Sequence, residues 1–67
     1  MDMAFKHQTD SYRTRKGIRY ECDGDICDTT PNGRTIAWTR VTELRVGGRK
    51  AFFEKQDGFY RVFVAEA

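Results

Sequence analysis

Apolar and polar residues alternate most clearly in the last third of the chain. Two short runs that carry aromatic and β-branched residues, 51–56 and 59–65, are separated by Asp57-Gly58. Asp-Gly between such runs is typical of a two-residue β-hairpin turn, because both turn positions need a positive φ angle. The pattern therefore predicts an antiparallel hairpin at this end of the chain.

A two-residue turn also sets the register of this hairpin. It pairs one acidic residue with one basic residue, and two apolar residues with two others: Glu54 with Arg61, Phe53 with Val62, and Phe52 with Phe63. Cross-strand pairs of these kinds are favourable. Apolar side chains nevertheless fall on both faces of the hairpin, so the second face needs a cover. That face would be covered by closure of the sheet within the chain, by a second copy of the chain or by a partner protein.

The segment 34–46 fits two kinds of element. It is rich in β-branched residues, which have low helix propensity. At strand spacing one face holds Ile36, Trp38, Leu44 and Val46. At helical spacing one face holds Ile36, Arg40, Val41 and Leu44. The composition favours a strand with a bend in its middle, and we expect Trp38 to lie in the core of so small a domain.

Two shorter signals lie in the first half of the chain. Residues 18–22 alternate as a strand does, and the turn-forming residues 23–25 follow them. This spacing predicts a hairpin in which Cys22 and Cys27 face each other. Residues 1–16 are mostly polar and predict a weakly ordered arm or an edge strand.

These elements together predict an all-β, mainly β fold class. We expect a small antiparallel meander of four to six strands that curls into an open sheet or a small barrel, with a polar N-terminal arm. The 67 residues are predicted to form one domain, 1–67. A chain of this size buries only about 60% of its unfolded surface, so a walled active-site cavity beside the core is not expected.

Charge is distributed in blocks along the chain. Residues 20–32 hold four acidic side chains and no basic one, whereas 1–19 and 33–50 each hold five basic side chains against two and one acidic. The net charge is only +2. Blocks of this kind either neutralise one another in the fold or mark the footprint of a charged partner.

The residue types needed for catalysis or metal binding do not form a pattern. His7 is the only histidine and has no partner for a catalytic triad. Cys22 and Cys27 would supply half of a zinc site at most, so structural thiols are favoured over a redox pair or a metal site. We therefore expect no catalytic residue, no metal and no cofactor, and the chain is not predicted to be an enzyme.

No apolar run approaches the ~20 residues that a bilayer-spanning helix needs. The first residues lack the basic and then apolar plan of a secretory signal. We expect a cytoplasmic protein that does not bind membranes and whose cysteines are reduced. Only in size and composition does it resemble the short cytoplasmic proteins of bacteria and their phages.

The leading functional hypothesis is a protein-binding module that acts as an inhibitor or regulator by docking on a larger protein complex, or that forms a homodimer. Its expected contacts are exposed aromatic residues of the last hairpin, together with either the charged loop 21–28 or the basic residues of 40–50. The residues expected to touch a partner are Phe59, Tyr60, Phe63, Arg40, Arg45, Arg49 and Lys50. The alternative is a nucleic-acid-binding β domain, in which phosphates would also contact the first basic block: Arg13, Arg15, Lys16 and Arg19.

Overall fold

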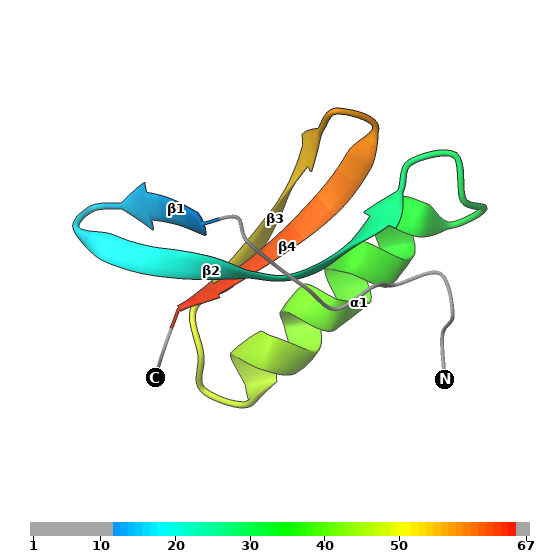
Figure 1. Cartoon of the computed structure of the whole chain (residues 1–67). Helices are drawn as coiled ribbons and strands as arrows, with labels where there is room; N and C mark the ends of the chain where they lie inside the picture. The colour runs from blue at the N-terminus through cyan, green and yellow to red at the C-terminus, as the bar shows by residue number, and fades with distance from the viewer. Residues whose placement is uncertain (1–11, 66–67) are drawn as a thin grey trace.

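The computed structural model describes residues 12–65 as four antiparallel strands and one helix (Figure 1). The elements follow one another as β1 (Tyr12–Arg15), β2 (Ile18–Cys27), α1 (Gly33–Val46), β3 (Ala51–Gln56) and β4 (Phe59–Ala65). The strands form one sheet in the order β1-β2-β4-β3, which curls into an open half-barrel. The predicted class, a small, mainly β antiparallel fold, is confirmed.

The hairpin of β3 and β4 has the predicted turn and register. Asp57 and Gly58 both adopt positive φ angles, 53° and 82°. The three predicted cross-strand pairs are all present: Glu54 with Arg61, Phe53 with Val62, and Phe52 with Phe63. Lys16 and Gly17, with φ angles of 52° and 79°, form the same kind of turn between β1 and β2.

Helix α1 occupies the segment for which a strand was favoured, and that prediction is wrong. One side of α1 buries Ala37, Val41 and Leu44, which follow one another at spacings of four and three residues. They pack against a shared core that includes Ile26 and Val62. Burial against the sheet therefore outweighs the low helix propensity of the β-branched residues.

The outward side of α1 carries Trp38, which is half exposed. The prediction that this residue lies in the core is therefore wrong.

The helix ends at a glycine pair, where the Gly47 amide donates to the Glu43 carbonyl and Gly48 adopts a φ angle of 88°. The Arg49 amide then donates to the Leu44 carbonyl. This reversal leads the chain into β3 and leaves several basic residues at the C-terminal end of α1.

The face of the sheet away from α1 holds a second apolar cluster. Tyr20 and Phe63 are buried in it, and Ile18, Cys22 and Phe52 pack against them. Both apolar faces of the β3–β4 hairpin are therefore covered within the chain itself, which is one of the three covers expected.

β2 continues through the residues for which a turn was predicted. A bulge between Cys22 and Gly24 shifts its register against β4, and Cys27 ends the same strand. The two cysteines therefore do not face each other across a hairpin, so that prediction is wrong. At the N-terminal end, Tyr12–Arg15 is an edge strand, whereas residues 1–11 of the predicted arm, with His7, lie outside the described residues.

Candidate functional site

The aromatic residues of the C-terminal hairpin were expected to be exposed contacts, and the structure corrects this. Phe63 is fully buried, under the second apolar cluster. Tyr60 is half-buried and packs against the core beneath α1. Phe59, also half-buried, pairs with Cys27 of β2 at the start of β4. Phe63 and Tyr60 thus belong to or border the core, and none of the three rings is fully exposed to a partner.

Arg40 was another expected partner contact, and its side chain is engaged inside the protein. Its guanidinium donates to both carboxylate oxygens of Asp23, from Nε at 2.7 Å and from a terminal nitrogen at 3.0 Å. Glu43 lies 3.6 Å away on the same helix. The hydrogen bond to Asp23 is the main reason that the pKa of Arg40 is raised above its ordinary value. Arg40 therefore ties α1 to the bulge of β2.

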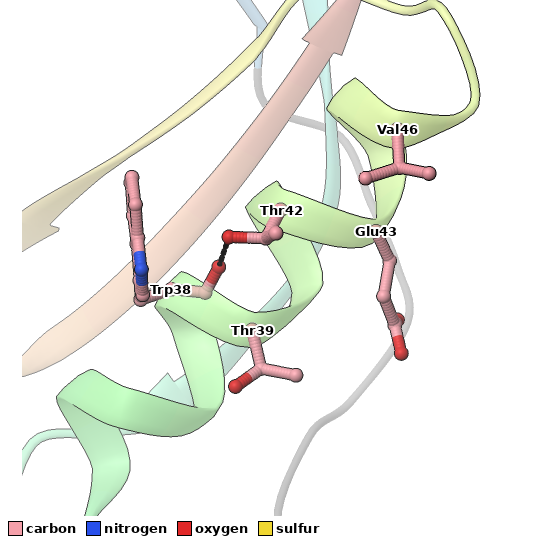
Figure 2. Close-up of a pocket in the computed structure, with 5 residues that line it drawn as sticks. All are labelled: Trp38, Thr39, Thr42, Glu43 and Val46. Atoms are coloured by element: carbon pink, nitrogen blue, oxygen red, sulfur yellow. Dashed lines mark hydrogen bonds between the residues drawn. The ribbon is translucent and has the colours of Figure 1, made fainter.

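The outward side of α1 presents apolar groups to solvent. Trp38 is 50% exposed and Val46 is 83% exposed. In Figure 2 the Trp38 ring lies on the flank of α1 toward β3, Glu43 and Val46 lie on the opposite flank, and Thr39 and Thr42 lie on the helix between them. We refer to this set as the α1 surface, and it has five members: Trp38, Thr39, Thr42, Glu43 and Val46.

Trp38 stands between two shallow hollows. One, of about 500 Å³, is lined by the α1 surface itself. The other, of about 390 Å³, lies between α1 and β3 and is lined by Arg34, Thr35, Trp38 and Phe53. The indole is thus accessible from two sides.

The Trp38 ring also has ordered neighbours on the protein. The Phe53 ring meets it edge-on, with 6.3 Å between centroids and an angle of 67° between planes. The Arg45 guanidinium lies 5.4 Å from the indole centroid. Contacts of both kinds are favourable and limit the rotamers of the ring.

The α1 surface was missed because Trp38 was assigned to the core. The signal that could have found it is the helical spacing of Val41 and Leu44, noted in the sequence. On a helix with these two residues inward, Val46 points outward, although it shares a face with Leu44 on a strand.

Two arginines of β1 cover the second apolar cluster. The Arg13 guanidinium lies 4.9 Å from the Phe63 ring centroid, and Arg15 lies 3.7 Å from that of Phe52. Arg13 also donates to Glu54 at 2.8 Å and to Gln56 at 2.6 Å. Of the residues proposed for nucleic acid, Arg13 is therefore bound within the protein.

The structure brings four expected basic residues together at the C-terminal end of α1. Arg15 from β1 joins Arg45, Arg49 and Lys50 around a groove of about 370 Å³. We refer to it as the basic groove, and it has four cations and two aromatic rings in its lining: Arg15, Arg45, Arg49, Lys50, Tyr20 and Phe52.

The remaining two basic candidates lie at the β1–β2 hairpin. Lys16 is an exposed turn residue that makes no ion pair with residues 12–65. Arg19 is largely exposed, lies 4.2 Å from the ring centroid of Tyr12, and is 3.7 Å from a carboxylate oxygen of Glu21. Both follow Arg15 closely in the sequence.

The two cysteines are free thiols on one strand. Four strand residues lie between them, which puts the two cysteines more than about 12 Å apart and too far for a disulfide. Burial is the main reason that the pKa of the Cys22 thiol is raised, and Cys22 Sγ lies 3.6 Å from the carbonyl oxygen of Gly24. Across residues 12–65 no three His, Cys, Asp or Glu side chains gather where they could hold a metal ion.

No helix in the described part of the chain is long and apolar enough to cross a membrane. No known protein family, curated protein or solved structure matches this chain. The geometry described above leaves two candidate binding surfaces among residues 12–65, the α1 surface and the basic groove.

Proposed function

We propose that this domain is a non-catalytic docking module that binds another protein through the α1 surface, with Trp38 as its anchor. The observation that carries the proposal is the exposure of the chain's one tryptophan, on the outer side of a helix and between two hollows. Docking of this kind would let the domain inhibit or regulate the larger protein by covering part of its surface.

Tryptophan is the residue type most enriched among the anchors that dominate binding energy. Half of the Trp38 side chain is exposed and would be buried by a partner. Its contacts with Phe53 and Arg45 already restrict the ring, so binding would lose little side-chain entropy. Val46 and the methyl groups of Thr39 and Thr42 would extend the apolar contact around it.

The charges beside Trp38 indicate the chemistry of the partner. Arg34 lines the hollow next to the ring, and Arg45 lies over the ring itself. Neither arginine forms an ion pair within residues 12–65, whereas Glu43 is near Arg40. The complementary partner is a protein surface with an apolar hollow that is rimmed by carboxylates.

The proposal places this activity in the cytoplasm of a cell, where Cys22 and Cys27 would stay reduced. Neither cysteine is needed for docking, because both lie on β2 rather than on the α1 surface.

The test is affinity capture from a cell lysate with the wild-type domain and with Trp38→Ala. Tyr12→Ala is the matched control, because Tyr12 is the other half-exposed aromatic residue, 52% exposed, and lies on β1. We expect one protein to be retained by the wild type and by Tyr12→Ala after nuclease treatment, and to be lost with Trp38→Ala. An anchor residue of this type contributes at least about 2 kcal/mol, or roughly a 30-fold change in affinity.

Two results would reject the proposal. Equal retention by Trp38→Ala would show that the α1 surface is not the contact. A wild-type domain that sediments as a dimer, and becomes monomeric with Trp38→Ala, would show that a second copy of this chain covers the surface instead.

A further inference from the structure

The basic groove combines residues that are distant in the sequence. Arg15 ends β1, Arg45 lies in the last turn of α1, and Arg49 and Lys50 precede β3. Four positive charges therefore converge on one end of a molecule whose net charge is only +2. Placing like charges together costs free energy unless an anion is bound between them.

The carboxylates of residues 12–65 do not neutralise this groove. Arg45, Arg49 and Lys50 make no ion pair with any residue from 12 to 65. Within the described part of the chain, Glu54 is the one acidic side chain that reaches a lining residue, and it is 3.8 Å from Arg15 and closer, at 2.8 Å, to Arg13. Two other acidic side chains have basic partners outside the groove, Asp28 with Lys55 and Glu43 with Arg40.

Two of the arginines are held in place by the backbone. Arg45 Nε donates to the Ala51 carbonyl at 3.0 Å, and Arg49 Nε donates to the Ala65 carbonyl at 3.1 Å. A guanidinium has five N–H donors, and these bonds use one in each case. The terminal nitrogens stay available to form the paired hydrogen bonds that arginine makes with phosphate oxygens.

We propose that the basic groove binds the phosphate groups of single-stranded nucleic acid. Arg45, Arg49 and Lys50 would contact consecutive phosphates. This site is separate from the α1 surface except for Arg45, which borders both.

Arg15 supplies a contact for a base as well as for a phosphate. Its guanidinium lies 3.7 Å from the centroid of the Phe52 ring, and its side chain is 55% exposed. The outer side of that guanidinium is a planar platform on which an unstacked base can lie. Lys16 and Arg19 continue the positive charge along the β1–β2 hairpin, so a chain of phosphates fits better than a single ion.

A single strand also fits better than a duplex. Reading the major groove of DNA requires a helix or a two-stranded ribbon that protrudes. The one helix described is packed along the sheet, and its outward side carries the apolar α1 surface. A groove beside a curled sheet, with cations and a stacking platform, matches how single strands are bound.

The test measures the fluorescence anisotropy of a labelled oligothymidylate of about 12 nucleotides at increasing salt. Each phosphate contact on a single strand contributes a slope of about −0.7 to log K against log salt. The four cations of the groove thus predict a slope of about −3 for the wild type. Arg49→Gln combined with Lys50→Gln should reduce it to about −1.5 and weaken binding at low salt about tenfold.

The matched control is Arg34→Gln combined with Lys55→Gln. This control also removes one arginine and one lysine, but from the opposite ends of α1 and β3. It should bind the oligonucleotide like the wild type. Amide chemical shifts in the titrated wild type give a second readout that needs no variant. They should move at residues 15–16 and 49–52 and stay constant around Asp57.

Several outcomes would overturn the proposal. Equal weakening in both double variants would reveal general charge attraction. Shifts confined to the α1 surface, or no binding at low salt, would reject the groove as the site. If polyglutamate of equal length binds as tightly as the oligonucleotide, with the same shifts, the groove is a contact for an acidic protein. Loss of capture with Trp38→Ala would leave this test unaffected.

Discussion

The guanidinium of Arg40 on α1 donates to both carboxylate oxygens of Asp23 on β2, at 2.7 and 3.0 Å. Asp23 is the residue at which β2 bulges, between the paired residues Cys22 and Gly24. The carboxylate is mostly buried, with 15% of its side chain exposed, and Arg40 is 32% exposed. This two-bond contact fixes α1 against the strand that carries the bulge.

Replacement of Arg40 by Ala should therefore lower the free energy of unfolding by about 1–2 kcal/mol. A partly exposed pair contributes less than a buried one, but removing Arg40 also leaves Asp23 without its closest cation. Urea unfolding of Arg40→Ala, Asp23→Ala and the double variant would measure the coupling energy directly. Arg34→Ala on the same helix, which removes an exposed arginine, should change stability by less than about 0.5 kcal/mol. Additive effects of the two single changes would contradict this role.

Leu44 and Val46 give a direct test of the helix. On a strand these two residues share a face, whereas on α1 Leu44 is buried at 7% exposure and Val46 is exposed at 83%. Leu44→Ala should cost about 2–4 kcal/mol of unfolding free energy, and Val46→Ala less than about 0.5 kcal/mol. Leu44→Val is a milder variant if the first does not fold. Similar losses at both positions in thermal unfolding would contradict the helix.

The two parts of the fold differed in how far the sequence could predict them. In the β3–β4 hairpin, Asp57-Gly58 and the cross-strand pair of Glu54 and Arg61 are local signals that agree with each other. The helix has no such agreement, because its β-branched residues favour a strand while the burial of Val41 against the sheet favours a helix. Local composition cannot weigh a contact with strands that come later in the chain.

The candidate sites were predictable only in part for a similar reason. The basic residues were identified from their positions in the sequence, but only the fold shows that Arg15 joins Arg49 and Lys50 while Arg13 pairs with Glu54. Trp38 was assigned to the core because a small domain can rarely leave a large ring outside. Smaller residues of α1, namely Ala37, Val41 and Leu44, fill the core instead.

Gly58 tests the turn that fixes the hairpin. Its φ angle is 82°, and a Cβ at this position would meet no heavy atom within 4 Å. The cost of Gly58→Ala is therefore one of backbone conformation alone, about 1–2 kcal/mol, or a fall in melting temperature of roughly 4–16 °C for a domain of this size. Asp57→Asn keeps a residue that tolerates a positive φ and should leave the melting temperature nearly unchanged. A Gly58→Ala variant as stable as the wild type would exclude this turn.

Cys22 should make the stability of the protein depend on pH in the alkaline range. Burial raises the pKa of its thiol in the folded state, so the folded protein holds this proton more tightly than the unfolded chain does. The stabilisation is complete below the pKa of the unfolded thiol, about 8.5, and is lost as pH rises through the higher folded pKa. Under reducing conditions, the free energy of unfolding should therefore fall between about pH 8 and 10 more steeply for the wild type than for Cys22→Ala.

Cys27→Ala is the control for the Cys22 prediction, since it keeps the Cys22 thiol and should follow the wild-type slope. The absolute stability of Cys22→Ala also includes lost packing against the second apolar cluster, so the slope is the quantity to compare. Identical slopes for Cys22→Ala and the wild type would show that the thiol is as well solvated in the folded protein as in the unfolded chain.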